Sequence, residues 1–205
     1  GKLADKAMVV HNILPVDDVR KRSLENPQDF HPDKNYLNIV TAARLDNRQK
    51  RLDRAIEVMR RMTGEGKKVR WYVFGEGDDR TYLERLIKKY RLEDVFMLMG
   101  NRSNVLPYVR MADVFAMTSA FEGRPIAVDE ALAVGTPVIA ASYASAVQQI
   151  DDGVTGIITE NSTKGVYEAV NYIYSHRKVL DKFRENLRSK RFNTTAEEFM
   201  RLIEE

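Results

Sequence analysis

From Asn38 onward, the chain alternates between short runs rich in β-branched and aromatic residues and longer segments whose apolar residues recur at helical spacing. We expect strands at residues 38–42, 69–74, 95–99, 113–117, 137–141 and 156–159. Leu52, Ile56 and Met59 illustrate the helical spacing between the first two strands. The alternation predicts an α/β fold, a doubly wound parallel sheet of about six strands with helices on both faces.

Two segments flank this alternation and differ from it in composition. Residues 1–34 hold one apolar, strand-like run at residues 7–10, followed by a polar stretch that contains three prolines. We interpret them as an entry strand and a linker. Residues 35–175 form the predicted α/β domain, and residues 176–205 form a charged C-terminal helical segment.

The composition excludes several classes of site and compartment. The sequence has no cysteine, and its three histidines lie far apart, so we expect no disulfide, no cysteine nucleophile and no metal site. It has no apolar run of about 18 residues and no charged-then-apolar leader, so neither a membrane span nor a secretion signal is expected. A cytoplasmic setting fits these features.

The net charge is only +3, but basic residues gather after the first expected strand. They are Arg44, Arg48, Lys50, Arg51 and Arg54. Cations at the start of a helix oppose its dipole, which indicates either a solvated basic face or a site for an anion. Nucleic acid is not an expected partner, because the segment has neither interleaved aromatic residues nor a known nucleic-acid-binding motif.

Polar or glycine-rich residues follow the expected strands. They are Arg44 after the first, Gly75-Glu76-Gly77 after the second, Gly100-Asn101-Arg102 after the third, residues 118–122 after the fourth and residues 142–145 after the fifth. In an open parallel sheet, ligands bind in the crevice outside the carboxyl ends of the strands. We therefore expect one ligand site at this edge of the sheet.

The run Gly75-Glu76-Gly77 lies between a strand and a helix, which is also the setting of a dinucleotide-binding loop. Arg80 stands where that fingerprint has its third glycine, so a plain tight turn is favoured over an NAD or FAD site. The sequence contains no P-loop motif.

Glu122 and Glu130 bracket another expected strand-to-helix turn, in the run FEGRPIAVDEALAVG. Gly123 permits close backbone approach, and Pro125 suits the first helical position. Helical side chains lean toward the N-terminus, so we expect Glu130 to aim its carboxylate at the crevice and the free amides of the turn to hold an anion. The alternative is that Glu130 is a buried carboxylate satisfied by backbone amides or an arginine.

The run TSAFEGRPIAVDEALAVGTPVIAAS, preceded by VLPYVRMADVFAM and followed by DDGVTGI, resembles the donor-binding half of retaining glycosyltransferases of GT-B family 4. That family carries an E-x7-E signature in this setting. The run TAARLDNRQKR is similar to the end of the family's first strand, where an arginine and a lysine contact the donor diphosphate. The resemblance extends in order over residues 9–158 and implies a Rossmann-like sheet, the C-terminal half of a GT-B fold.

The resemblance implies a role for each matched residue. As catalytic residues, Arg44 and Lys50 would neutralise the leaving diphosphate, and Glu122 would lie at the transferred sugar. Glu130 would accept hydrogen bonds from the ribose hydroxyls. The other donor-binding residues would be Gly123, Arg124, Pro125 and Ile126, in the turn whose amides hold the phosphates, and Asn101 and Arg102, which edge the nucleobase.

Three features depart from the family's pattern. Arg124 stands where an apolar residue is usual, and Thr118 replaces a proline. The loop at residues 142–149 has Gln148 and Gln149 instead of paired glycines and a following glutamate. The loop departures concern contacts to the donor sugar, so the sequence does not specify that sugar.

The resemblance predicts a domain that takes a UDP- or GDP-sugar as donor and a glycan or glycolipid as acceptor, without a metal cofactor. The family's N-terminal Rossmann-like domain, which supplies the acceptor site, has no counterpart before Gly1, so the chain would be an excised domain, inactive alone. Peripheral membrane contact of the full-length protein is a further expectation. The alternatives are a noncatalytic nucleotide-sugar-binding module and a sugar-nucleotide epimerase of the same fold.

Overall fold

A six-stranded sheet, with every pairing parallel, forms the centre of the computed structural model, which describes residues 14–190 and 192. The strands are β1 (Leu37–Ala42), β2 (Val69–Phe74), β3 (Phe96–Gly100), β4 (Val114–Met117), β5 (Val138–Ala141) and β6 (Gly156–Thr159). Their order in the sheet is β3-β2-β1-β4-β5-β6. The predicted sheet is confirmed, while the predicted entry strand at residues 7–10 lies outside the described residues.

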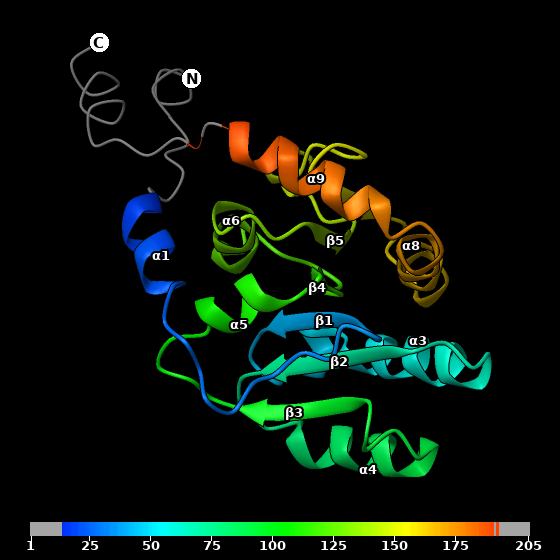
Figure 1. Cartoon of the computed structure of the whole chain (residues 1–205). Coiled ribbons are helices and arrows are strands. Elements are labelled where there is room, and N and C mark those ends of the chain that lie inside the picture. The colour runs from blue at the N-terminus through cyan, green and yellow to red at the C-terminus, as the bar shows by residue number, and fades with distance from the viewer. Residues whose placement is uncertain (1–13, 191, 193–205) are drawn as a thin grey trace, which may run out of the picture.

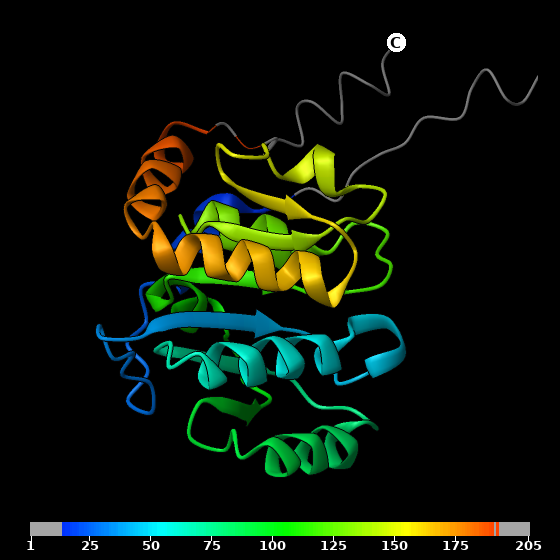
Figure 2. The same ribbon diagram turned by 90° about the vertical axis from the view of Figure 1, so that its right-hand side faces the viewer.

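Helices cover both faces of this sheet (Figures 1 and 2). They are α1 (Val16–Arg22), α2 (Asn47–Lys50), α3 (Leu52–Gly64), α4 (Arg80–Tyr90), α5 (Leu106–Met111), α6 (Ile126–Ala133), α7 (Ala146–Gln149), α8 (Thr163–Ser175) and α9 (Lys178–Ser189). The apolar side chains of α3, α4 and α8 pack on one face, and those of α5, α6 and α7 pack on the other. The doubly wound arrangement that the alternation predicts is therefore present.

The central strands are buried on both faces, as near-continuous apolar runs in a parallel sheet require. A chain of buried hydrogen bonds also crosses three of them. Trp71 Nε1 in β2 donates to Thr41 Oγ1 in β1 at 3.0 Å, and Thr41 Oγ1 donates to the carbonyl of Ala116 in β4 at 2.7 Å. The buried polar groups of Trp71 and Thr41 are thereby satisfied.

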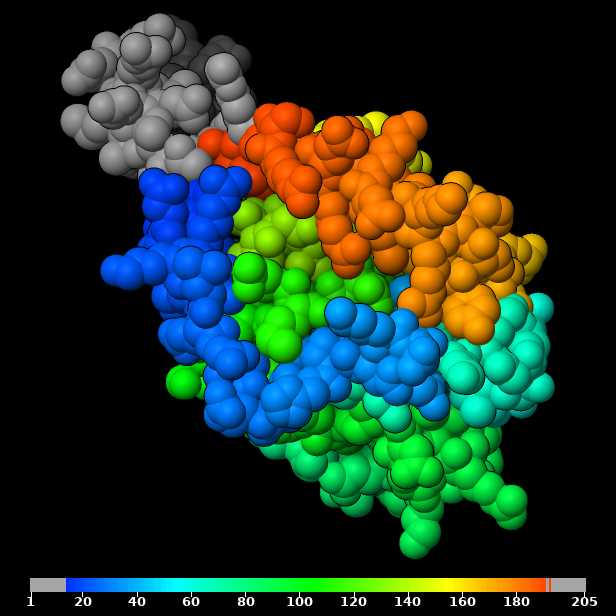
Figure 3. Space-filling view, viewed as in Figure 1, coloured from blue at the N-terminus to red at the C-terminus, as the bar shows by residue number. Residues whose placement is uncertain are grey.

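The segment before β1 is part of the domain rather than a free linker. It contains α1, which the sequence reading did not expect, and Phe30, which is buried among Tyr72, Phe74 and Tyr108. Figure 3 shows this segment, in blue, lying directly on the green part of the chain. The predicted boundary after residue 34 therefore does not separate two packing units.

The predicted C-terminal helical segment also packs on the domain as far as it is described. Leu180, Phe183 and Leu187 on one side of α9 are buried. Leu180 joins the core on the face of α3, whereas Leu187 joins the core on the face of α6. Of the predicted segment at residues 176–205, residues 191 and 193–205 lie outside the described part of the chain.

Candidate functional site

The sheet changes its direction of winding between β1 and β4. These strands are neighbours, yet the helix α3 that follows β1 and the helix α6 that follows β4 pack on opposite faces. The loops that leave the two strands are joined by hydrogen bonds. Thr118 Oγ1 donates to the carbonyl of Lys50 at 2.8 Å, and the amide of Ala120 donates to the carbonyl of Gln49 at 2.8 Å. Such a switch point is where open α/β sheets bind ligands.

Lys50 is brought to this switch point by a break between α2 and α3. Asp46 caps α2 by accepting from the amide of Gln49, and Arg51 ends it in the left-handed region, with φ of 50°. The single helix expected after β1 is therefore two helices that meet at Arg51. This turn places Lys50 beside the loop that follows β4.

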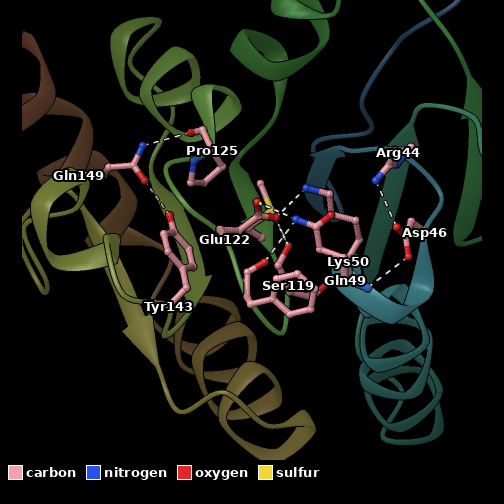
Figure 4. A network of polar contacts seen from close by, with 12 residues as sticks. Arg44, Asp46, Gln49, Lys50, Ser119, Glu122, Pro125, Tyr143 and Gln149 are labelled. Atoms are coloured by element: carbon pink, nitrogen blue, oxygen red, sulfur yellow. Dashed lines mark hydrogen bonds and ion pairs between the residues drawn. The ribbon is translucent and has the colours of Figure 1, made fainter. Parts of the chain in front are cut away.

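Glu122 is the centre of a polar cluster in these loops (Figure 4). Its Oε1 accepts from Lys50 Nζ at 2.6 Å and from Ser119 Oγ at 2.6 Å, and its Oε2 accepts from Gln49 Nε2 at 3.2 Å. The side chains of Glu122 and Lys50 are only 7% and 15% exposed. Three donors therefore satisfy a carboxylate that is nearly out of solvent, as burial of a charge requires.

Sequence reasoning identified Lys50 and Glu122 but missed Gln49 and Ser119, which complete the cluster. Of these two residues, only Ser119 could have been suspected from the sequence, because it lies three residues before Glu122 in the same loop. Gln49 is found only through the fold, because it reaches Glu122 across 73 positions of sequence.

A cavity of about 410 Å³ opens at the carboxyl ends of β1, β2 and β3. Arg44, Asn101 and Arg102, all candidates from the sequence, line it together. The Arg44 side chain is 66% exposed, and its guanidinium lies 3.2 Å from Asp46 Oδ2. Lys50, Glu122 and Glu130 are not part of the cavity wall. The predicted residues thus divide between this cavity, the end of α2, where Lys50 lies, and the loop and helix that follow β4.

Arg102 is tied into the wall of the cavity rather than free. It donates to the carbonyls of Met99 and Asn101 and, at 2.7 Å, to Asp29 Oδ2. Tyr108 connects the same groups, because its hydroxyl accepts from Arg102 Nε and donates to Asp29 Oδ1 at 2.8 Å. The hydrogen bonds from Tyr108 and Arg102 lower the pKa of Asp29. Arg102 thus connects the cavity to the segment before β1.

The glycines of the Gly75-Glu76-Gly77 turn face protein backbone. A Cβ on Gly75 would lie 2.0 Å from the carbonyl oxygen of Ala43, and one on Gly77 would lie 2.5 Å from that of Leu45. The two glycines therefore let the loops after β1 and β2 pack together. This packing requirement supports the tight-turn interpretation over a dinucleotide-binding loop.

The turn that leads into α6 holds Gly123, Arg124, Pro125 and Ile126. The Arg124 guanidinium forms two hydrogen bonds with Asp129, at 3.0 and 3.2 Å, so its side chain lies along the first turn of α6. Within residues 14–190 and 192, the backbone amides of Arg124 and Ile126 have no acceptor. An amide at a helix N-terminus that lacks an acceptor is available to an anion.

Glu130 is partly buried in α6, and its carboxylate has no hydrogen bond or ion pair in the described part of the chain. Burial raises the pKa of its carboxyl, Arg22 opposes that change and Asp129 adds to it. The sequence also allowed Glu130 to be a buried carboxylate that backbone amides or an arginine satisfy. The described residues provide no such hydrogen bond or ion pair. Within residues 14–190 and 192, the acceptor capacity of the Glu130 carboxylate is unused.

The basic residues after β1 are mostly engaged with neighbouring groups. Arg51 forms two hydrogen bonds with Asp53, at 3.0 Å each. Arg54 donates to Asn161 Oδ1 and to the carbonyl of Thr118. Arg48 is exposed, and Lys50 binds Glu122. The cluster is therefore not a free basic face.

Two features are absent from the described residues, 14–190 and 192. No group of three or more histidine, cysteine, aspartate or glutamate side chains there is arranged to hold a metal ion. None of the helices there combines the length and the apolar character that crossing a bilayer requires.

Comparison with known proteins identifies the family. Residues 23–190 match the model of the family described as Glycosyl transferases group 1. A putative colanic acid biosynthesis glycosyltransferase, WcaL of Salmonella typhimurium, is 32% identical over 139 residues, which cover 63% of this chain and 34% of WcaL. The chain thus spans about a third of the length of this curated relative.

Solved structures share the fold at lower identity. Anabaena HepE, solved in complex with UDP, superposes with a TM-score of 0.68 at 21% identity, over 75% of this chain and 43% of HepE. The lipopolysaccharide outer core galactosyltransferase WaaB superposes with a TM-score of 0.75 at 20% identity, over 99% of this chain and 57% of WaaB. The sheet is therefore the Rossmann-like sheet of GT-B proteins, and the chain belongs to the glycosyl transferases group 1 family.

Proposed function

We propose that the chain is the donor-binding half of a retaining glycosyltransferase, which moves a sugar from a UDP- or GDP-sugar to a glycan or glycolipid. The observation that carries this proposal is the contact between Lys50 and Glu122 at the switch point between β1 and β4. The group 1 family, the name of WcaL and the UDP bound to HepE support the class of substrate.

Positive charge at this edge suits a leaving diphosphate. Lys50 carries three N–H donors and uses one on Glu122, so two remain for phosphate oxygens. Arg44 is exposed and pairs with Asp46 through one nitrogen, which leaves most of its donors free. Charge that grows on the leaving group is best met by such donors held in position, and loss of one typically costs ~3 to 4 kcal/mol.

The remaining contacts follow from the unused groups. Glu130 has acceptor capacity for the ribose hydroxyls, and the amides of Arg124 and Ile126, which have no acceptor among the described residues, suit the phosphates. The cavity bordered by Asn101 and Arg102 has a size that suits a nucleobase and part of its ribose. Glu122 would then face the transferred sugar from the loop after β4.

Transfer needs more than the donor half. The acceptor must be held in line and water must be excluded, and the chain spans only about a third of WcaL. Apolar side chains at this edge, Phe121, Ile126 and Val147, are exposed in the described structure. We therefore expect the chain alone to bind a nucleoside diphosphate and to transfer no sugar.

Melting curves test the proposal directly. The chain is heated with UDP, GDP or ADP, and the best ligand enters a product assay with its sugar conjugate. At a ligand concentration of about ten times Kd, we expect a Tm increase of roughly 3 to 5 °C. A Tm that no nucleotide changes would contradict donor binding. Sugar transfer by this chain alone would instead contradict the need for a second half.

A further inference from the structure

The loop after β5 holds the turn that leads into α6 through two side chains. Ser145 Oγ donates to the carbonyl of Gly123, and Gln149 Nε2 donates to the carbonyl of Pro125 at 3.1 Å. Gln149 is only 2% exposed, and Figure 4 shows it between Pro125 and Tyr143. These contacts connect a loop that departs from its family's pattern to the proposed phosphate-binding turn.

The orientation of the Gln149 amide is determined by its neighbours. The Pro125 carbonyl can only accept, so the nitrogen of Gln149 must face it. The oxygen of Gln149 then accepts from the Tyr143 hydroxyl at 3.0 Å. Tyr143 is buried in the apolar core on this face, and burial raises the pKa of its hydroxyl, which stays a donor at neutral pH. Both ends of Gln149 are therefore satisfied.

Holding the two carbonyls also orients two amides. All peptide bonds in the described part of the chain are trans, so each carbonyl and the next amide point in opposite directions. With the carbonyls of Gly123 and Pro125 turned toward Ser145 and Gln149, the amides of Arg124 and Ile126 point away from that loop. These are the amides that have no acceptor within residues 14–190 and 192.

We propose that Gln149, together with Ser145, is a positioning residue that aims the Arg124 and Ile126 amides at the terminal phosphate of a nucleoside diphosphate. This inference rests on the proposed function, because it assumes that the turn binds phosphate. Gln149 acts through the backbone and does not touch the ligand. Loss of Gln149 leaves the Pro125 carbonyl with only the Val128 amide as donor, at 3.1 Å, so the peptide unit before Ile126 is held less firmly. This weakens the contact to the terminal phosphate and leaves the nucleoside contacts unchanged.

The test compares UDP with UMP, which lacks the terminal phosphate, by isothermal titration calorimetry on the whole chain. In Gln149→Met, which keeps the side-chain length, we expect about tenfold weaker UDP binding and UMP binding within about twofold of wild type. In its ionised form, Gln149→Glu keeps an acceptor for Tyr143 but offers no donor to Pro125, so at a pH where this carboxyl is ionised it should show the same selective loss. Gln148→Met is the matched control, because Gln148 is exposed and should leave both affinities unchanged.

The outcomes separate this inference from the proposed function. If wild type binds UDP and Gln149→Met loses UDP and UMP affinity equally, or loses neither, the positioning role is overturned. If wild type binds no nucleotide, the proposed function fails first, and this inference fails with it. Should Gln149→Met not fold, as its melting curve without ligand would reveal, Ser145→Ala carries the test and should show the same selective loss of UDP affinity.

Discussion

Lys50 Nζ lies 2.6 Å from Glu122 Oε1, although 72 positions of sequence separate the two residues. Lys50 ends α2 after β1, and Glu122 belongs to the loop after β4. The contact therefore joins the two sides of the doubly wound sheet at the point where they diverge. One pair holds the loops together and also keeps a cation and a carboxylate side by side at the proposed donor site.

Breaking this pair should reveal a coupling between the two side chains. Lys50→Met leaves Glu122 with Ser119 and Gln49 but without its cation, so we expect it to lower the free energy of unfolding by about 2 to 4 kcal/mol. The double variant with Glu122→Gln should lose less than the sum of the single losses, with a coupling of roughly 1 to 3 kcal/mol. Urea unfolding of the four proteins measures it.

The exposed pair of Arg60 and Glu57 on α3 is the matched control for this cycle, because both side chains are in contact with solvent. Its coupling should be much smaller than that of Lys50 and Glu122. Equal couplings in the two cycles would show that burial does not strengthen the Lys50–Glu122 contact.

Glu130→Gln should have opposite effects on nucleotide binding and on stability. The variant loses a charged acceptor for the ribose, so we expect UDP binding to weaken by about 1 to 3 kcal/mol. It also removes a carboxylate whose charged form burial disfavours, so the Tm without ligand should rise at neutral pH. Glu168→Gln, on the exposed side of α8, should change neither quantity. An unchanged UDP affinity in Glu130→Gln would leave Glu130 with a structural role only.

The size of the Glu130 effect on stability depends on pH. The pKa of Glu130 is higher in the folded chain than the usual 4.5. Between pH 4.5 and this raised pKa, the folded state therefore binds more protons than the unfolded state. Stability of wild type therefore falls as the pH rises through this window. The Tm advantage of Glu130→Gln should be absent below pH 4.5, grow through the window and then stay constant.

Glu65 should show the opposite dependence on pH. Hydrogen bonds from Lys67 and Tyr167, with one from Arg61, lower the pKa of Glu65 from 4.5 to about 2. The stability that Glu65 contributes is present above pH 4.5 and is lost as the pH falls toward 2. Glu65→Gln should therefore be less stable than wild type at pH 7, and the difference should shrink on acidification. A difference that is independent of pH would contradict this assignment.

The strands, and the edge of the sheet where the candidate site lies, could be predicted from the sequence. The reason is that strands of a buried parallel sheet are continuous apolar runs, and the segments between them have apolar residues at helical spacing. The helix α1 was missed because only seven residues form it, and only Val16 and Val19 among them are buried. A pattern that short cannot be distinguished from a polar linker.

The contacts within the site were harder to predict than its location. The position of Lys50 depends on the left-handed backbone conformation of Arg51. An arginine gives no sign of this conformation in the sequence, because residues other than glycine rarely adopt it. The family resemblance assigned Arg102 to the nucleobase. Its hydrogen bond to Asp29 could not be predicted, because it requires the segment before β1 to lie beside the loop that follows β3. Such contacts join residues far apart in sequence, so spacing alone does not contain them.

The turn at Gly75-Glu76-Gly77 should tolerate no side chain at Gly77. A Cβ there would lie 2.5 Å from the carbonyl oxygen of Leu45, so backbone must move, and Gly77→Ala should cost about 1 to 3 kcal/mol of unfolding free energy. Gly64→Ala is the control, because a Cβ added there would have no neighbour within 4 Å outside its own helix and its adjacent residues. Alanine also has a higher helix propensity than glycine, and Gly64 is the last residue of α3. That variant should be at least as stable as wild type. If Gly77→Ala kept its stability and lost only nucleotide binding, the glycine would serve ligand approach instead.

Binding of a nucleoside diphosphate should not need a divalent metal. Arg44, Lys50 and the amides of Arg124 and Ile126 already present positive charge where the diphosphate is proposed to lie. Magnesium ions in solution bind the same phosphate oxygens and reduce their negative charge, so they should compete with these groups. We therefore expect the Kd for UDP to be equal or lower in a chelator than in millimolar magnesium, as measured by calorimetry in the two buffers. Tighter binding with magnesium would mean that the metal belongs to the bound complex, and the proposed role of the protein cations would have to be revised.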